Sequence, residues 1–295
     1  MSLAYQRSDA HIVDYELYQL PGIDDVFRGP PITSDYYIAC IGAAQTFGRF
    51  VQAPFPALIW RSLGIDTLNL GRGGAGPTLH LSNPRIMEHI NRARVVIVQV
   101  LSGRSQSNSI FRLLDHRPRG INLVNGSELT ADQFYTWLVR EDLELARKIV
   151  AETRENYVMA MIQLLDAIKP PKILLWFSVR SPDYQEHWEL PIGRLWGNYP
   201  QLVNREMLNR LQSHADIYVE CVSRQGLPQP LFDRSGVPTS FQSFSELSSE
   251  IATRNENRYY PSPEMHENAA ALLIPACREL LNRPEPDATV QDQEV

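Results

Sequence analysis

Three short segments place small and hydroxyl-bearing residues at the ends of apolar runs, where chemistry could occur. They read GAAQTFGR at 42–49, GRGGAG at 71–76 and SGRSQSN at 102–108. Glycine, alanine and serine let backbone N–H groups approach a ligand closely, as an oxyanion hole or an anion-binding nest requires. Within these segments, Thr46 and Ser105 are the hydroxyl candidates for a catalytic role. Tight turns between strands and helices also need glycine, so a purely structural reading fits the same residues.

An arginine follows each of the five strands expected below. These residues are Arg49, Arg72, Arg104, Arg180 and Arg224. Arginine forms bidentate bonds with phosphate, sulfate and carboxylate groups, so converging side chains would make an anion site. Almost all of the 28 basic residues are arginine, and chance therefore explains several of these positions equally well.

His266 is the candidate general base of the chain. A hydroxyl nucleophile needs a base within hydrogen-bond reach, and that base is held by a third group. Glu264 precedes His266 by two residues, and helical residues with this spacing do not share a face. The sequence therefore identifies a base without its orienting partner, and packing of His266 against the first loop is the alternative.

The composition is that of a globular chain and disfavours several classes of function. The 295 residues are 43% hydrophobic and 21% charged, and a net charge of −6 argues against nucleic-acid binding. Cys40, Cys221 and Cys277 lie on apolar segments, which predicts buried free thiols. No run resembles a signal peptide or a membrane span, so we expect a cytoplasmic protein, and no metal or cofactor is predicted.

Apolar runs alternate with amphipathic segments from residue 36 onward. Strands are expected at 36–42, 65–70, 95–101, 172–179 and 216–222, and helices at 54–63, 83–92, 141–168, 203–214 and 264–281. Strands rich in Val, Ile and Leu that alternate with helices predict a parallel sheet covered on both faces. The expected fold is α/β: a flavodoxin-like three-layer αβα sandwich with five parallel strands. With the order 2-1-3-4-5, a ligand site would lie at the carboxyl ends of strands one and three.

The domain organisation follows from the same reading. Residues 1–35 are expected to form an arm packed on a single domain of residues 36–283, followed by a disordered acidic tail at 284–295. Segments 102–140 and 180–200 are too long for plain connections and are read as insertions. The second insertion carries Tyr184, Trp188, Trp196 and Tyr199, which either pack the loop onto the body or stack on a ligand.

Four segments resemble the conserved blocks of the SGNH/GDSL hydrolases, in the family's order. They are IACIGAAQTFG at 38–48, NLGRGGAG at 69–76, VVIVQVLSGRSQSN at 95–108 and NRYYPSPEMHENAAALL at 257–273. The resemblance implies an SGNH-like fold over residues 36–282. It also places the family's catalytic Ser on Ala44, its Asp on Asn257 and its His on Tyr260, so all three triad positions are replaced. Gly74 and Asn108 match the oxyanion-hole elements.

Two further resemblances extend this one. The layout of FRGP, GAAQTFGRF, NLG, SGR-x-x-SN and YYPSPEMH is similar to that of a group of alphaproteobacterial proteins of unknown function. The first turn also resembles that of capsule-biosynthesis acyltransferase-like proteins, whose cysteine falls on Ala44. Both resemblances imply the same fold with a degraded catalytic centre.

Three hypotheses for function follow. The first is a transferase or esterase-like hydrolase without a covalent intermediate, acting on an anionic or glycan/acyl substrate with His266 as base. The second is a ligand-binding protein or pseudoenzyme that uses the same cleft. The third is an interaction partner in envelope-polysaccharide biosynthesis. In the first two cases the predicted ligand is an anionic small molecule or glycan, contacted by Gly42, Ala44, Gln45, Gly74, Ser102, Gly103, Arg104, Asn108, Arg180 and Tyr260.

Overall fold

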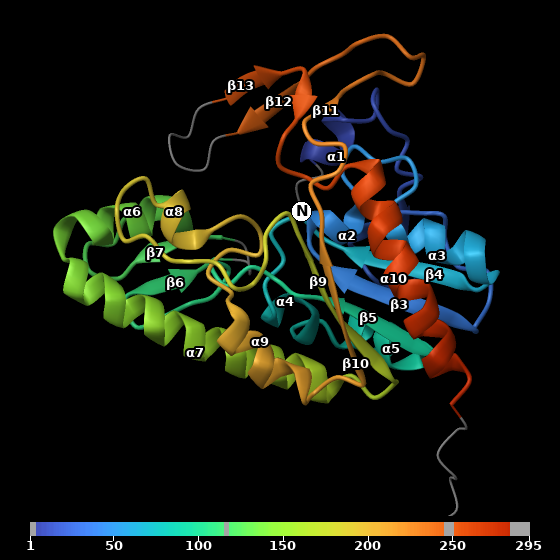
Figure 1. The fold of residues 1–295 in the computed structure, drawn as a ribbon, viewed down its shortest axis with the longest axis horizontal. Helices are drawn as coiled ribbons and strands as arrows, with labels where there is room; N and C mark the ends of the chain where they lie inside the picture. Colours follow the sequence, from blue (N-terminus) through green and yellow to red (C-terminus); the bar gives the residue numbers. More distant parts are fainter. Residues whose placement is uncertain (1–3, 115–117, 245–250, 284–295) are drawn as a thin grey trace, which may run out of the picture.

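A five-stranded parallel sheet forms the centre of the computed structural model, which describes residues 4–114, 118–244 and 251–283 (Figure 1). Its strands are β3 (Tyr37–Gly42), β4 (Asp66–Gly71), β5 (Val95–Gln99), β9 (Lys172–Ser178) and β10 (Ile217–Val222). They lie in the order β10-β9-β5-β3-β4, which is the predicted order 2-1-3-4-5. The predicted α/β sandwich with five parallel strands is thereby confirmed.

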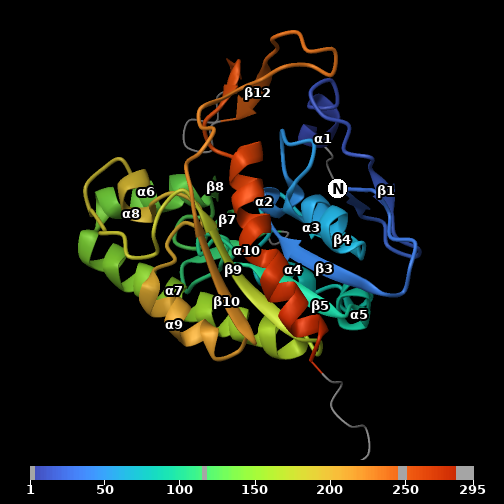
Figure 2. The same ribbon diagram turned by 45° about the vertical axis from the view of Figure 1, so that its right-hand side comes forward.

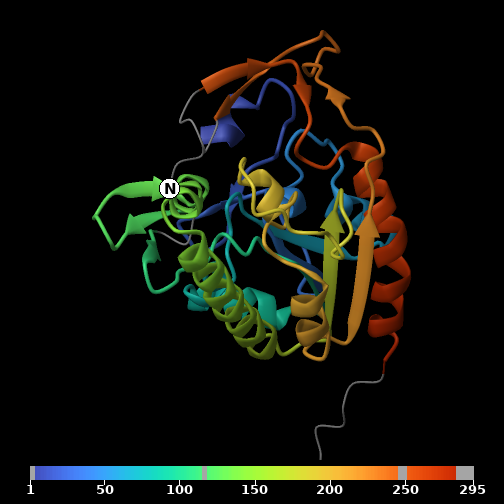
Figure 3. The ribbon, with the colours of Figure 1, turned by 60° about the vertical axis from the view of Figure 1, so that its left-hand side comes forward.

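Helices cover both faces of this sheet. The long ones are α3 (Phe55–Leu63), α5 (Pro84–Arg92), α7 (Leu143–Ala167), α9 (Arg205–Gln212) and α10 (Pro263–Leu281). Alternate strand residues pack against α3 and α10 on one face and against α5, α7 and α9 on the other. The turned view shows α7 and α10 on opposite sides of β9 and β10 (Figure 3). Successive side chains along each strand point to opposite faces of the sheet, so the sheet has one hydrophobic core on each face.

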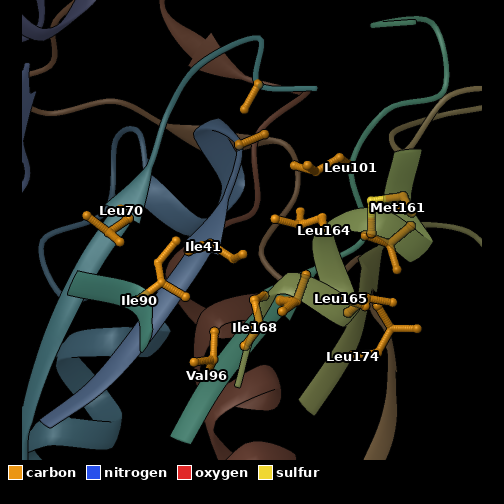
Figure 4. Packing of buried hydrophobic residues seen from close by; sticks show 14 of the residues in the cluster. Ile41, Leu70, Ile90, Val96, Leu101, Met161, Leu164, Leu165, Ile168 and Leu174 are labelled. Carbon is orange, nitrogen blue, oxygen red and sulfur yellow. The ribbon is translucent and has the colours of Figure 1, made fainter. Parts of the chain in front are cut away.

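The larger core lies between the sheet and α5 and α7. Figure 4 shows strand side chains meeting helix side chains there; the labelled residues are Ile41, Leu70, Ile90, Val96, Leu101, Met161, Leu164, Leu165, Ile168 and Leu174. Side-chain caps define where the helices begin. Asn83 caps α5 by accepting from two backbone N–H groups, and Ser262 caps α10.

The predicted helix at 141–168 is wrong at its start. Asp142 caps α7, so that helix begins at Leu143, and a separate helix α6 (Ala131–Glu141) ends directly before it. Thr130 and Gln133 form a capping box at the start of α6. The predicted start at residue 141 lies two residues before the observed one, and the sequence analysis assigned residues 131–140 to the first insertion without predicting α6 there.

The two insertions pack against each other. Segment 102–140 contains α6 and a small antiparallel sheet of β6 (Phe111–Leu113), β7 (Arg119–Asn122) and β8 (Glu128–Thr130). Segment 180–200 contains α8 (Gly193–Trp196). Both contribute to one apolar cluster with the first half of α7, and that cluster includes Trp196. The aromatic residues of the second insertion therefore pack the loop onto the body, although Trp196 and Tyr199 also reach the cleft described below.

The N-terminal segment meets residues 223–244 and 251–262 at the carboxyl end of the sheet (Figures 1 and 2). The first contains α1 (Ala4–Ser8), β1 (Tyr18–Gln19) and β2 (Val26–Phe27). The second contains β11 (Gln229–Pro230), β12 (Phe241–Phe244), β13 (Ile251–Arg254) and β14 (Glu256–Asn257), none of which the sequence analysis predicted. The remaining short helices, α2 (Ala44–Phe47) and α4 (Thr78–Leu81), follow β3 and β4.

Arg28 joins the N-terminal segment to the body. Its guanidinium donates to the carbonyl oxygens of Phe47, Gly48, Val51 and Gln52, and burial lowers the pKa of Arg28 to about 10. Because four carbonyl oxygens of the loop after β3 bind this one buried guanidinium, Arg28 fixes the N-terminal segment to that loop.

The predicted disordered tail at 284–295 lies outside the described residues. In the described part of the chain, every helix is too short or too polar to cross a membrane.

Candidate functional site

A cleft of about 1930 Å³ opens at the carboxyl ends of β3, β4 and β5. Residues 43–45 and 71–75 contribute to its lining, as do Ser102, Arg104 and Ser105, so each of the three small-residue loops reaches it. Most of the other lining residues come from α1, from residues 24–26, from the two insertions, and from β12 and β13 with the segment 254–260. The cleft therefore joins parts of the chain that lie far apart in sequence.

Gln99 organises the turn after β3 from the side of the core. Its Oε1 accepts from the backbone N–H of Ala43, from the N–H of Thr46 and, at 2.6 Å, from the Thr46 hydroxyl. Gly42 makes this approach possible, because a Cβ there would lie 2.1 Å from Thr46 Oγ1 and 2.4 Å from Gln99 Oε1. The Thr46 hydroxyl is thus buried and committed to the fold, which argues against its predicted catalytic role.

The other side of this turn faces the cleft. Ala43, Ala44 and Gln45 line it, so the position that the resemblance assigns to a nucleophile carries a methyl group. Gln45 is only 3% exposed, yet its Oε1 has no hydrogen-bond partner among the described residues. A buried polar atom without a partner costs about 1–3 kcal/mol, so such an atom at a cleft indicates a site for a ligand or a water molecule.

The loops after β4 and β5 complete this part of the lining. Gly74 has a φ of 76°, a left-handed conformation that favours glycine, and it lines the cleft as predicted for an oxyanion element. Ser102 lines the cleft but donates its hydroxyl to Gln201 Oε1 at 2.8 Å. Ser105 is buried and also lines the cleft. The structure therefore brings Gly74, Ser102 and Ser105 together with Ala44 and Gln45.

Three of the five arginines that follow strands line the cleft, and each is ion-paired. Arg72 binds both oxygens of Asp25, Arg104 binds both oxygens of Asp132, and Arg49 binds the fully buried Asp9 at 2.6 Å. Two more cleft arginines, Arg119 and Arg258, pair with glutamates. The predicted convergence is thus partial, and carboxylates offset much of its positive charge.

Four predicted ligand contacts do not line this cleft: Gly42, which lies against Thr46 and Gln99 as described above, and Arg180, Asn108 and Gly103. Arg180 donates to the carbonyl oxygens of Asn198, Pro200 and Val203 and so holds the second insertion in place. Asn108 donates to Tyr135 and Thr153 and caps the loop that precedes β6. Gly103 donates its N–H to the carbonyl of Gln201. Their bonds are those of structural residues, and this disfavours their predicted binding role.

His266 lies in the core and does not line the cleft. Its ring is fully buried against Phe55 and Phe177, and its Nδ1 accepts from the Phe55 N–H at 3.1 Å. Burial lowers the pKa of His266 from its ordinary 6.5 to about 3. A side chain without access to the cleft cannot take a proton from a ligand there, so this placement argues against His266 as the base.

Asn257 shapes the segment that carries Tyr259 and Tyr260 to the cleft. Its Oδ1 accepts from the N–H groups of both tyrosines, and its Nδ2 donates to the carbonyl of Tyr260. The Tyr260 hydroxyl accepts from Arg49 at 3.0 Å, while the Tyr259 hydroxyl accepts from Gln201. The position that the resemblance assigns to the catalytic Asp thus holds the segment in shape through Asn257, and the position assigned to the catalytic His places the Tyr260 side chain on the cleft.

Other polar atoms on the cleft also lack partners. Trp196 is 2% exposed, and its Nε1 donates to none of the described residues. Within the same ranges, Gln6 Oε1 is buried and unpartnered. Together with Gln45, these atoms give the cleft two acceptors and one donor that a bound ligand could satisfy.

Sequence reasoning missed Gln99, Gln201 and Tyr259. A signal for Gln99 was present, because it is a lone polar residue inside the apolar strand VVIVQV. The other two gave no comparable signal, since their roles depend on contacts across the fold. Over the described ranges, no cluster of three or more His, Cys, Asp or Glu side chains could hold a metal ion.

Comparisons with known proteins give a family and a set of remote structural likenesses. The family model described as "Domain of unknown function (DUF6473)" matches residues 1–119 and 135–281. Among curated proteins, no sequence gives a significant match.

The structural likenesses include esterases and a lipase. An acetyl xylan esterase from the rumen bacterium Butyrivibrio proteoclasticus shares 13% identity and a TM-score of 0.44, with 87% of this chain and 67% of that chain covered. A lipase from a goat rumen metagenome shares 12% identity and a TM-score of 0.42, over 82% and 97%. An acetylxylan esterase mutant from Geobacillus stearothermophilus shares 11% identity and a TM-score of 0.40, over 86% and 97%.

Proposed function

This chain belongs to the family described as "Domain of unknown function (DUF6473)", and we propose that its cleft binds an uncharged, hydroxyl-rich ligand of the glycan type without covalent chemistry. The observation that carries this proposal is the set of buried, unpartnered polar atoms of Gln6, Gln45 and Trp196 on one cleft, as judged over the described residues. In native proteins nearly all buried polar atoms form hydrogen bonds. Several unpartnered buried polar atoms on residues of one cleft therefore favour a polar ligand.

The residues of the cleft favour binding over covalent turnover. Among the described residues that line it, none is His or Cys, and the resemblance places the nucleophile position on Ala44. Ser105 supplies a hydroxyl on the cleft, but a serine nucleophile needs a base within hydrogen-bond reach. With His266 in the core, the ligand-binding hypothesis is better supported than the transferase or hydrolase hypothesis.

The charge balance favours a neutral ligand over an anionic one. Arg72 and Arg104 each meet a carboxylate at about 3 Å, and both partners line the cleft with them. Each of these ion pairs offers hydrogen-bond donors on the arginine and acceptors on the carboxylate side by side. This suits hydroxyl groups, which both donate and accept. A phosphate or sulfate would instead compete with Asp25 and Asp132 for the arginines.

Aromatic rings supply the apolar part of such a site. Tyr259 is 44% exposed on the cleft, and Tyr260, Trp196 and Phe241 line it as well. The ring faces can pack against the C–H face of a sugar while its hydroxyls reach the polar groups.

Calorimetric titration with neutral oligosaccharides, uronic-acid oligosaccharides and aryl acetate esters tests the proposal. We expect binding of a neutral oligosaccharide, and we expect Tyr259→Ala to weaken it about 5- to 30-fold, since one aromatic contact contributes roughly 1–2 kcal/mol. Tyr36→Ala is the matched control, because Tyr36 is 45% exposed and lies outside the cleft. Preference for the uronic-acid ligands, or ester turnover above the uncatalysed rate, would contradict the proposal.

A further inference from the structure

The cleft is larger than a site for a small ligand needs to be. Its volume of about 1930 Å³ exceeds the roughly 300–1,000 Å³ of pockets for drug-sized molecules, which are about as large as two or three sugar rings. Small-ligand pockets also enclose most of the surface of their ligand. A glycan that fills this cleft is therefore longer than a disaccharide or a trisaccharide.

Two groups of elements that lie apart from each other line the cleft. We call them the terminal wall, which comprises α1, β12, β13 and residues 254–260, and the insertion wall, which comprises lining residues within 118–133 and 191–201. Figures 1 and 2 show α1 of the terminal wall and α8 of the insertion wall well separated at the carboxyl end of the sheet. A ligand must extend along the cleft to meet both walls.

Each wall carries one buried polar atom that has no partner among the described residues. On the terminal wall this atom is Gln6 Oε1, which is a hydrogen-bond acceptor. On the insertion wall it is Trp196 Nε1, whose N–H is a donor. Sugar hydroxyls can donate to the first atom and accept from the second. Both walls thus offer a contact to a glycan, and neither contact is taken by the described chain.

We infer that the cleft binds one glycan chain of at least four sugar rings, which contacts the terminal wall and the insertion wall at the same time. Hydroxyls of one part of the chain donate to Gln6 Oε1, and a hydroxyl of another part accepts from Trp196 Nε1. Once one wall is bound, the linked rings meet the other wall at a high effective concentration, so a long chain binds more tightly than a short one. The inference rests on the proposed function, because it names the size class of glycan that the cleft takes.

A chain-length series on the wild-type protein tests this inference directly. The probes are β-1,4-linked glucose, mannose and xylose oligosaccharides and α-1,4-linked glucose oligosaccharides of two, four and six rings, titrated into the full chain by calorimetry. In a series that binds, the Kd should fall at least 10-fold between two and six rings, because only the longer members reach both walls.

Two substitutions test the contact with each wall. Gln6→Met removes the acceptor and Trp196→Phe removes the donor, and each should weaken the six-ring ligand about 3- to 10-fold, as expected for one hydrogen bond. At most one of them should weaken the two-ring ligand, since a short ligand reaches one wall only. Gln52→Met and Trp188→Phe make the same chemical changes outside the cleft and should leave the affinity for both ligands unchanged.

The results distinguish failure of this inference from failure of the proposed function. A Kd that stops falling below four rings, a two-ring ligand weakened by both substitutions, or a six-ring ligand weakened by neither would overturn the inference and leave the glycan-binding proposal standing. Binding of no neutral oligosaccharide would overturn both. Urea unfolding of each variant establishes that a lost affinity does not come from a lost fold, and the chain-length series decides the question without any variant.

Discussion

The turn after β3 has two sides that differ in how their polar groups are satisfied. On the core side, Gln99 Oε1 accepts three hydrogen bonds from Ala43 and Thr46. On the cleft side, Gln45 is similarly buried, but its Oε1 has no hydrogen-bond partner within the described chain. The two residues share a side-chain type, so their environments alone account for the difference.

This contrast indicates that the core side of the turn has a structural role and that its cleft side has a role in binding. A ligand-binding group must be held in place by bonds that it does not make itself, and Gln99 supplies those bonds through Ala43 and Thr46, which lie on either side of Gln45 in the turn. The same arrangement would orient a nucleophilic side chain at position 44, where this chain has an alanine. The chain thus keeps a rigid turn at the carboxyl end of the sheet and uses it, in our proposal, for recognition.

The largest loss of stability is expected from a substitution on the core side of the turn. Gln99→Met keeps the shape of the side chain but leaves the N–H groups of Ala43 and Thr46 and the Thr46 hydroxyl unpaired. We expect the free energy of unfolding to fall by about 3–5 kcal/mol, since each buried unpaired group costs roughly 1–3 kcal/mol and the costs are not additive. Urea unfolding followed by circular dichroism measures this. A loss below about 1 kcal/mol would show that the turn does not depend on Gln99.

The next effect concerns His266, whose Nε2 has no partner among the described residues but lies in the core instead of the cleft. Its pKa of about 3 in the folded state lies below the ordinary 6.5, so the unfolded chain binds the proton first as the pH falls. The free energy of unfolding should therefore decline below pH 6.5, and this histidine alone should account for about 2 kcal/mol between pH 7 and pH 5.

His266→Gln removes that titration and keeps a hydrogen-bond acceptor near Phe55. Plotted against pH, the unfolding free energy of the variant should be flatter than that of the wild-type protein by this amount. Parallel curves would mean that His266 is protonated equally in both states. Ligand affinity at pH 7 should not change, because His266 does not line the cleft.

The smallest change in stability is expected from a substitution on the cleft side of the turn. Gln45→Met is the same chemical change as Gln99→Met, yet it removes no hydrogen bond that the described chain makes. We expect the free energy of unfolding to stay constant or to rise by up to about 1 kcal/mol, because an unpaired buried amide is replaced by an apolar group. Chemical unfolding of the two variants side by side gives the comparison. A loss similar to that of Gln99→Met would show that Gln45 is a structural residue.

Much of the fold could be predicted because its signals are local. Runs of Val, Ile and Leu between amphipathic helices indicated the parallel sheet, and the predicted strand order is the observed one. Helix ends followed from single residues such as Gly64 after α3. The antiparallel strands in residues 223–262 were missed because they are short and pair irregular segments.

The candidate site was predictable only in part. Glycine and alanine at the ends of β3 and β4 marked the loops that line the cleft, since small residues are needed wherever backbone and ligand approach. The predicted roles of Thr46, Asn108 and Arg180 rested on their positions after strands, but position does not reveal whether a side chain points to the cleft or to the fold. Their hydrogen-bond partners decided that question.

The sequence by itself determined the sheet, its helices and the small-residue turns, because hydrophobic period and turn chemistry act between near neighbours. Only the tertiary structure decided that His266 is buried beside Phe55, 211 residues earlier in the chain, and that Arg104 meets Asp132. It also decided that the Oε1 atom of Gln99 has hydrogen-bond partners while that of Gln45 has none among the described residues. Burial and pairing depend on which distant residues the fold brings together, and no local pattern encodes the identity of those partners.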